Sequence, residues 1–179
     1  MIGGKVLERH LGESELADCV CRLGREMAAD LAGKKPLFVG ILKGAAIFFS
    51  DLVRACDFPL EMAFMQVSSY QGTESSGTVS VVFDGTPSVQ GRTVVVVDDV
   101  LDTGTTMAFL RRYFQEKGAA EVRTAAMFLK PDVFRGDFTP EYVGMEIGKA
   151  FIVGYGLDYE GEGRHWKEIY RMIPEEMER

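Results

Sequence analysis

Thirteen residues near the middle of the chain, Val94 to Thr106, restrict its fold more than any other segment; they read VVVVDDVLDTGTT. Four consecutive valines are β-branched and apolar, which is typical of a strand that is buried on both faces of a parallel sheet. Asp98 and Asp99 end this run, and Asp102 follows three residues later in a loop of threonine and glycine. The segment therefore predicts a strand, an acidic pair and a short polar loop.

A helix is expected directly after this loop, because apolar side chains recur at helical spacing in Met107, Leu110, Tyr113 and Phe114. At the carboxyl end of a parallel strand, such a loop exposes backbone N–H groups beside the positive end of the helix dipole, which favours an anion. A loop rich in hydroxyl groups suits one phosphate, and the carboxylates before it suit ribose hydroxyls. The alternative is an ordinary buried strand with a polar helix cap, although three carboxylates exceed what a cap requires.

Two common nucleotide-binding motifs are excluded by the residues of this loop. A Walker A loop needs a Lys-Ser/Thr pair after its glycines, and a dinucleotide-binding loop needs GxGxxG directly after the strand. Neither pattern follows the valine run.

Composition sets broader limits. The 179 residues fit one domain, 1–179, with a sizeable core, and 46% hydrophobic with 26% charged residues is an ordinary globular balance. A net charge of -7 disfavours broad binding to nucleic acid. No apolar run approaches a membrane span and no signal-peptide pattern is visible. Cys19, Cys21 and Cys56 lack metal-site spacing and favour reduced thiols in the cytoplasm.

The rest of the chain alternates between strand and helix patterns. Helices are predicted over residues 14–32, with Ser14 as the cap, 45–56, and from the central loop to about 117, and strands over 36–42, 60–67, 78–83, 122–129, 142–146, 151–155 and 169–173, with a weak candidate at 5–7. This alternation predicts an α/β fold with a mostly parallel sheet. Residues 68–77 are rich in Ser and Gly, which indicates a lid or binding loop at the tip of a hairpin.

Three further segments accompany the central motif. Leu42-Lys43-Gly44 follows the first buried strand, Ser68-Ser69-Tyr70 opens the polar loop, and Phe151 to Tyr159 reads FIVGYGLDY. In this order and spacing the segments resemble the hypoxanthine(-guanine) phosphoribosyltransferases, a type I phosphoribosyltransferase family, over about Val6 to Ile173. The resemblance implies a twisted, mostly parallel sheet flanked by helices, with a small hood formed by the N- and C-terminal segments.

The resemblance also implies a reaction. Relatives transfer a 5-phosphoribosyl group from phosphoribosyl pyrophosphate (PRPP) to N9 of a 6-oxopurine, hypoxanthine or guanine, with Mg²⁺ as cofactor. The products are IMP or GMP and pyrophosphate, as in purine salvage. Family members are homodimers or homotetramers in the cytoplasm, and they need neither nucleic acid nor a membrane as a partner.

Residue roles follow from the resemblance, position by position. The residues implied to bind PRPP are Asp98, Asp99, Asp102, Thr103, Gly104, Thr105 and Thr106. Among them, Asp102 would be the catalytic general acid/base toward purine N7. Those implied to meet pyrophosphate are Lys43, Gly44 and Arg164, with a cis Leu42–Lys43 peptide, and Ser69 and Tyr70 belong to the lid. Those implied to bind the purine are Lys130, Phe151, Ile152 and Asp158, and those implied to bind Mg²⁺ are Asp98, Asp99 and Asp158.

The sequence departs from the family pattern in three places. Asp98 stands where relatives usually have Glu, Ala150 stands where they often have Lys, and the segment before His165 is richer in glycine. An RNA-binding regulator on the same fold remains an alternative, because such regulators share the Val-Asp-Asp-Val-Leu pattern, although they typically lack an acid at the position of Asp102. Among enzymes, xanthine-guanine or adenine transfer is the alternative, and Lys130 opposes adenine because its donor would face the 6-amino donor.

Overall fold

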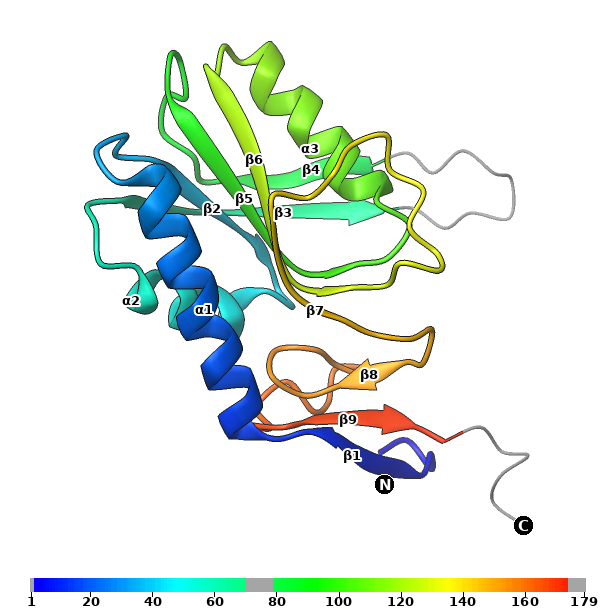
Figure 1. Cartoon of the computed structure of the whole chain (residues 1–179). Coiled ribbons are helices and arrows are strands. Elements are labelled where there is room, and N and C mark those ends of the chain that lie inside the picture. Colours follow the sequence, from blue (N-terminus) through cyan, green and yellow to red (C-terminus); the bar gives the residue numbers. More distant parts are fainter. Residues whose placement is uncertain (1, 70–78, 174–179) are drawn as a thin grey trace.

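The computed structural model of the chain describes residues 2–69 and 79–173 (Figure 1). Its elements are β1 (Leu7–Leu11), α1 (Glu13–Leu31), β2 (Leu37–Leu42), α2 (Ala46–Ala55), β3 (Glu61–Ser69), β4 (Val79–Asp84), β5 (Thr93–Leu101), α3 (Thr105–Glu116), β6 (Glu121–Leu129), β7 (Tyr142–Glu146), β8 (Ile152–Val153) and β9 (Ile169–Met172). Among these helices, none is long and apolar enough to cross a membrane.

The main sheet has six strands in the order β4-β3-β2-β5-β6-β7. All neighbouring pairs are parallel except β3 and β4, which form an antiparallel hairpin. This arrangement confirms the predicted α/β fold with a mostly parallel sheet. It also confirms that the Ser/Gly-rich segment connects the two strands of a hairpin, although its residues 70–78 lie outside the described part.

The valine run is buried on both faces of β5, as its composition predicted. Val95 and Val97 pack with α1 and α2 on one face, whereas Val94 and Val96 pack with α3 on the other. All four side chains are fully buried. Successive strand side chains point to opposite faces, so one central strand contributes to both halves of the core.

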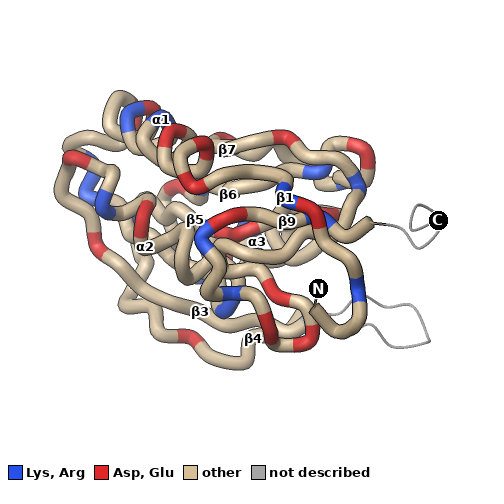
Figure 2. Tube along the Cα trace, turned by 90° about the horizontal axis from the view of Figure 1, so that it is seen from below, with Lys and Arg blue, Asp and Glu red and all other residues tan. Residues whose placement is uncertain are grey.

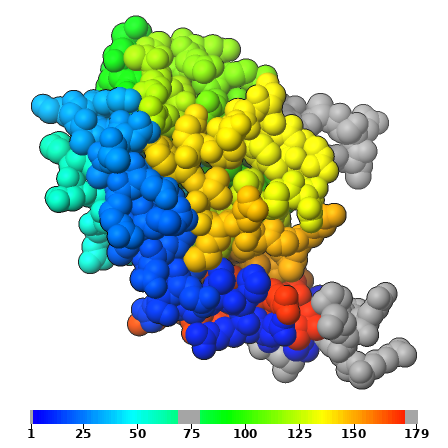
Figure 3. Space-filling view, in the orientation of Figure 1, coloured from blue at the N-terminus to red at the C-terminus, as the bar shows by residue number. Residues whose placement is uncertain are grey.

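A second, smaller sheet forms a hood from the two ends of the chain. Its order is β1-β9-β8, and both pairings are antiparallel. Figure 3 shows the N-terminal segment in blue against the C-terminal segment in orange and red, below the main body. The hood implied by the family resemblance is therefore present.

Charged residues are distributed over the whole trace, with Lys and Arg among Asp and Glu (Figure 2). Several form ties between elements. Arg111 of α3 bonds Glu141 before β7 at 2.9 Å, and the same carboxylate accepts the N–H of Thr124, a buried residue of β6, at 2.7 Å. Arg123 of β6 pairs with Asp30 of α1. These ties hold the helices against the sheet away from the carboxyl ends of its strands.

The element boundaries correct four predictions. Helix α1 begins at Glu13 with Gly12, not Ser14, as its cap residue, and the Gly12 N–H donates to Glu15 Oε2 at 2.8 Å. The acidic pair does not end β5, because the strand stays paired with β6 as far as Leu101. Strand β3 continues to Ser69. The predicted strand 151–155 is reduced to Ile152–Val153, because a tight turn with positive φ angles follows it.

The strand order indicates where a ligand-binding crevice lies in the main sheet. From β2 the chain first adds β3 on one side and later adds β5 on the other, so the direction of winding reverses between β2 and β5. In open α/β sheets, ligands bind at the carboxyl ends of the strands at such a switch point. Here those ends lead into Lys43-Gly44 and into Asp102 to Thr106.

Candidate active site

Three segments that are distant in sequence meet at this switch point. Gly44 lies so close to β5 that a Cβ atom on it would overlap Asp99 Oδ2. Gly156, from the turn after β8, lies against the same glycine, since a Cβ atom there would overlap the Gly44 carbonyl oxygen. The turn after β2, the acidic pair of β5 and the hood therefore form one site.

The acidic pair lies within the end of β5 and is half-buried. The Asp99 N–H donates to Asp98 Oδ1 at 3.0 Å, and the Val100 N–H donates to Asp99 Oδ1 at 2.7 Å. Burial raises the pKa of Asp98 well above its usual range, and the neighbouring charge of Asp99 adds to the effect. Burial also raises the pKa of Asp99, although the Val100 N–H and the charge of Arg164 oppose it. Two adjacent carboxyl groups of this kind favour a cation or a hydroxyl donor as ligand.

The loop after β5 is shaped around Gly104, whose φ of 85° is left-handed and whose missing side chain leaves room for the Phe134 ring. On its outer side Asp102, Thr103 and Thr105 are exposed, and Thr106 is half-buried. The Thr103 and Thr105 hydroxyls lie 3.0 Å apart. Because α3 begins at Thr105, these hydroxyls surround a helix N-terminus, as an anion site requires.

Lys130, directly after β6, faces this loop. Its Nζ lies 3.7 Å from Asp102 Oδ2, and its side chain is 13% exposed whereas that of Asp102 is 59% exposed. The chain is fixed there because the Lys130 N–H donates to the Leu101 carbonyl at 3.0 Å. Two residues that the sequence could assign only to separate segments thus form one charged pair.

The hood contributes four of the predicted residues. Phe151 is 48% exposed and meets Tyr159 edge to face, with the ring centroids 5.9 Å apart, whereas Ile152 is buried in β8. Asp158 Oδ1 pairs with Arg164 at 2.5 Å, and its Oδ2 accepts the Gly161 N–H at 2.8 Å. Arg164 also donates to the Gly156 carbonyl at 2.7 Å. Arg164 is therefore held at the turn that touches Gly44.

Lys43 and the two lid residues are the other predicted site residues. Lys43 is exposed and follows a cis Leu42–Lys43 peptide, as the resemblance implied. Of the lid residues, Ser69 is the last residue of β3, and Tyr70 lies outside the described residues.

The described residues contain no group of three or more His, Cys, Asp or Glu side chains that could hold a metal ion by themselves. Mg²⁺ is usually bound through one or two carboxylates together with waters and substrate phosphates, not by an all-protein cage. Asp98, Asp99 and Asp158 are oxygen donors of the right kind, so the donor set fits an ion that a phosphorylated substrate would share.

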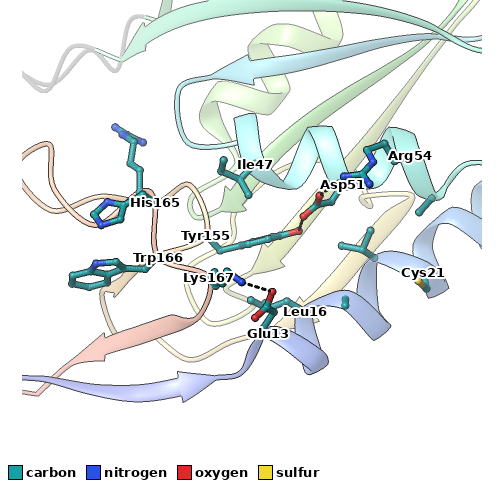
Figure 4. Close-up of a pocket in the computed structure, with 14 residues that line it drawn as sticks. Glu13, Leu16, Cys21, Ile47, Asp51, Arg54, Tyr155, His165, Trp166 and Lys167 are labelled. Atoms are coloured by element: carbon teal, nitrogen blue, oxygen red, sulfur yellow. Dashed lines mark hydrogen bonds and ion pairs between the residues drawn. The ribbon is translucent and has the colours of Figure 1, made fainter.

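Sequence reasoning missed the packing role of Gly156 and a hydrogen bond between Tyr155 and Asp51. The only sequence signal for either feature was the Gly-Tyr-Gly run at 154–156. Figure 4 shows Tyr155 and Asp51 at a cavity of about 480 Å³ between α1, α2 and the segment from Tyr155 to Lys167. Of the predicted site residues, this cavity includes only Arg164.

Comparison with known proteins identifies the family. Residues 14–160 match the family model described as a phosphoribosyl transferase domain. The chain belongs to the phosphoribosyltransferase family. Two curated relatives named hypoxanthine-guanine phosphoribosyltransferase are similar over most of their length. The protein from Streptococcus pneumoniae is 42% identical over 95% of this chain and 89% of its own, and that from Aquifex aeolicus is 40% identical over 94% and 96%.

Solved structures agree with this phosphoribosyltransferase assignment. A hypoxanthine phosphoribosyltransferase from Staphylococcus aureus superposes with a TM-score of 0.89 at 36% identity, covering 96% of this chain and 94% of that one. A hypoxanthine-guanine phosphoribosyltransferase from Bacillus anthracis, whose active site contains a HEPES molecule, gives 0.88 at 30% identity, covering 93% and 98%. This phosphoribosyltransferase is an enzyme of the hypoxanthine-guanine type and of the fold that the sequence predicted.

Proposed function

We propose that this enzyme transfers the 5-phosphoribosyl group of PRPP to N9 of hypoxanthine and guanine, giving IMP or GMP and pyrophosphate in purine salvage. The observation that carries the proposal is the convergence of Lys43-Gly44, the acidic pair, the hydroxyl-rich loop and the hood at one switch point. The similarity to relatives with hypoxanthine-guanine names over nearly the whole chain supports it.

The 5-phosphate would bind in the loop from Asp102 to Thr106. The exposed hydroxyls of Thr103 and Thr105 and the backbone N–H groups at the start of α3 can donate to its oxygens. Gly104 allows this loop to turn, because its φ of 85° is costly for residues with a side chain. Asp98 and Asp99 would accept hydrogen bonds from the ribose hydroxyls.

Pyrophosphate would lie between the turn after β2 and the hood, where Lys43, Gly44 and Arg164 supply a cation, a close backbone approach and a second cation. Asp98, Asp99 and Asp158 would hold Mg²⁺ together with the substrate. When bound, Mg²⁺ supplies positive charge that stabilises the negative charge developing on the departing pyrophosphate. Lys43 and Arg164 act in the same direction, because cations placed where charge develops lower the barrier.

The purine would stack on the exposed ring of Phe151, beside the backbone of Ile152, with O6 accepting a hydrogen bond from Lys130. Asp102 would exchange a proton with N7 while N9 is glycosylated. The 3.7 Å pair between Lys130 and Asp102 supports this arrangement, since it brings the group that would read O6 beside the group that would face N7. O6 and N7 are neighbours on the same edge of a 6-oxopurine.

A lid formed by the loop that begins at Ser69 and Tyr70 would exclude water from the oxocarbenium-like ribose. We further expect a homodimer or homotetramer. Met62, Val82 and Phe83 of the β3–β4 hairpin are each more than half exposed, which supports an interface at this edge of the sheet.

The net charge of -7 supports a small-molecule substrate over nucleic acid, and we expect no membrane partner. The three cysteines are free thiols, which supports a reducing compartment such as the cytoplasm.

Steady-state assays with hypoxanthine, guanine, xanthine and adenine, each with PRPP and Mg²⁺, test the proposal. Turnover of hypoxanthine or guanine is expected, with adenine inactive. Preferred turnover of adenine or xanthine would overturn the substrate assignment. Tight filter binding of pyrimidine-operon leader RNA without any turnover would support the RNA-binding alternative.

A further inference from the structure

The chain after β8 makes a tight turn whose conformation is unusual for its residues. Gly154 and Leu157 exchange both backbone hydrogen bonds at 3.0 Å, and between them Tyr155 and Gly156 have φ angles of 49° and 100°. A left-handed conformation is routine for glycine but unfavourable for a bulky residue such as tyrosine. Such outliers persist only where the surrounding structure over-determines them, and they are common at functional sites.

The side chain of Tyr155 explains what holds the turn. It is buried between α1 and α2, and its hydroxyl donates to Asp51 Oδ2 of α2 at 2.8 Å (Figure 4). Burial and the adjacent Asp51 carboxylate raise the pKa of Tyr155 far above its usual range, so the hydroxyl keeps the proton that it donates. Helix α2 begins two residues after Gly44. The hydrogen bond therefore connects the turn to the helix that follows Lys43-Gly44.

The backbone of the same turn connects to the other side of the site. The Gly156 N–H donates to the Arg164 carbonyl at 2.9 Å, and its own carbonyl accepts from Arg164 Nη1 at 2.7 Å. The Cα of Gly156 packs on the Gly44 carbonyl with no room for a side chain. Tyr155 and Gly156 thus lie between the two groups of residues that would meet pyrophosphate.

We propose that Tyr155 is a positioning residue, whose hydrogen bond to Asp51 fixes the Arg164 side of the pyrophosphate subsite relative to the Lys43-Gly44 side. This inference rests on the proposed function, because it assumes that both sides bind the pyrophosphate group of PRPP. Tyr155 itself would contact neither PRPP nor the purine. Its hydrogen bond holds the Lys43-Gly44 segment and the Arg164 segment at a fixed separation. The two segments are far apart in sequence, so the backbone alone does not fix the distance between them.

Three of the four residues implied to bind the purine are held without this tie, whereas the fourth, Asp158, pairs with Arg164. Ile152, which follows Phe151 directly, lies in β8 and is held by pairing with β9, and Lys130 is held by the main sheet through its bond to Leu101. Loosening the turn should therefore weaken PRPP and pyrophosphate binding while purine binding is retained. A residue that only stabilised the fold would instead lower the active fraction and leave both KM values unchanged.

The test replaces Tyr155 by Phe, which keeps the ring and removes only the hydroxyl. Loss of one such bond should raise the Kd for Mg-PRPP, measured by calorimetry, and the KM for pyrophosphate in the reverse reaction by about threefold to tenfold. The KM for hypoxanthine should stay within about twofold, below what one lost hydrogen bond to the base would cause.

Tyr170→Phe is the matched control. The Tyr170 hydroxyl also donates to a carboxylate, Glu168 Oε2 at 2.8 Å, and it also lies in the hood, but this bond links two residues of the hood and does not reach α2. It should leave PRPP binding unchanged.

Variants of Asp51 test the same bond from the other side. Asp51→Ala should reproduce the Tyr155→Phe effect, and the double variant should be no worse than either single one, because the two side chains act through one interaction. Asp51→Asn keeps a carbonyl acceptor and should restore most of the wild-type affinity. If Tyr155→Phe failed to fold, this comparison of Asp51→Ala with Asp51→Asn would decide the question alone.

Unchanged PRPP affinity in Tyr155→Phe, an equal rise in the purine KM, or the same effect in Tyr170→Phe would overturn the inference. So would strict additivity of Tyr155→Phe and Asp51→Ala. These outcomes leave the proposed function intact as long as the wild-type enzyme forms IMP or GMP. A wild-type protein that bound no PRPP would overturn the proposed function, and this inference with it.

Discussion

The loop after β5 and the turn after β8 both contribute to the site, but they are built in different ways. The first follows a long buried strand and leads directly into α3, so adjacent elements set most of its position, and the Arg135 N–H adds one contact from a distant segment at the Thr103 carbonyl. The second follows a strand of two residues and is placed by Gly44 and Asp51, which are distant in sequence, together with the nearby Arg164. The phosphate loop is thus local, whereas the hood turn is assembled across the chain.

The difference matters for how each region should respond to mutation. Removing a functional group from the local loop should change chemistry and leave the geometry intact, because the strand and helix still hold the backbone. Disturbing the turn after β8 or its partners should instead displace the residues of the site before it changes their chemistry. The four predictions below test this contrast, ordered by their expected effect on catalysis.

The largest effect is expected from Asp102→Asn in the local loop. The substitution keeps the size of the side chain but removes the group that would exchange a proton with the purine, so kcat for nucleotide formation should fall about 10²–10⁴-fold. The Kd for Mg-PRPP, measured by calorimetry, should be retained or improved, because one negative charge near the phosphate is removed.

Asp132→Asn, at an exposed carboxylate just beyond Lys130, is the control for Asp102→Asn and should be close to wild type. A normal kcat for Asp102→Asn would exclude it from the mechanism. Lost PRPP binding would make its role structural.

Gly44→Ala disturbs the assembled region directly. The new methyl group would overlap Asp99 Oδ2, so Asp99 or the turn must move. A displacement of about 1 Å at a positioned group can cost on the order of 100-fold in kcat/KM, and we expect a loss of that size with PRPP as the varied substrate. Gly148→Ala is the control, because a Cβ atom there meets nothing within 4 Å. Equal activity of the two variants would show that close packing at Gly44 is dispensable.

Lys130→Gln tests the charged pair between the loop after β5 and the end of β6. Loss of a charge-assisted hydrogen bond to O6 should reduce kcat/KM for hypoxanthine and guanine by about 1–3 kcal/mol, with little change in PRPP affinity. Lys34→Gln, at an exposed lysine that pairs with Glu121 on the amino side of the sheet, is the matched control. Wild-type kcat/KM for both bases in Lys130→Gln would show that another group reads O6.

Asp84→Asn should affect stability and not catalysis. Asp84 ends β4 and accepts hydrogen bonds from Tyr113 of α3 at 2.5 Å, from Lys117 just after α3 at 2.7 Å, and from Thr86. Burial raises the pKa of Asp84, but these donors together outweigh it and hold the pKa well below its usual range. Its folded-state pKa therefore lies below the unfolded value of about 3.9, so the stabilisation is complete above that pH and is lost as the pH falls below it.

Urea unfolding checks this prediction. At pH 7 the variant should unfold with a free energy about 1–3 kcal/mol lower than wild type, and the difference should shrink on acidification below about pH 4. Asp57→Asn, at an exposed carboxylate, should show no such difference. A gap that is constant with pH would mean that the Asp84 charge is unimportant.

Much of the fold was predictable, because the alternation of apolar runs with amphipathic segments reports local structure. The double burial of Val94 to Val97, the parallel sheet and the helix after Gly104 follow from residues within a few positions of each other. The helix cap at Gly12 was missed for a physical reason. Glu15 accepts the Gly12 N–H, which is the half of a capping box that the third helical residue supplies, and Gly12 has no side chain that would mark it as a cap in the sequence.

The candidate site was predictable only where family motifs carry it. The sequence could place Lys43, Asp102 and Lys130 at strand ends, but it could not show that Lys130 pairs with Asp102 or that Gly156 packs on Gly44. Such contacts depend on strand order, which local patterns do not encode. The short strand β8 was overestimated because Gly154 and Gly156 adopt positive φ angles that the apolar pattern around them does not reveal.

The pairing of β1 with β9 has a consequence for how the molecule is made. Leu7 lies opposite Met172, so a strand from the first dozen residues must remain without its partner while about 160 further residues are translated. The main sheet has no such delay, because each of its parallel strands is followed within a short stretch by a neighbour. The ribosome therefore releases a nascent chain whose phosphate loop can form early, whereas the hood, and with it the purine side of the crevice, closes last.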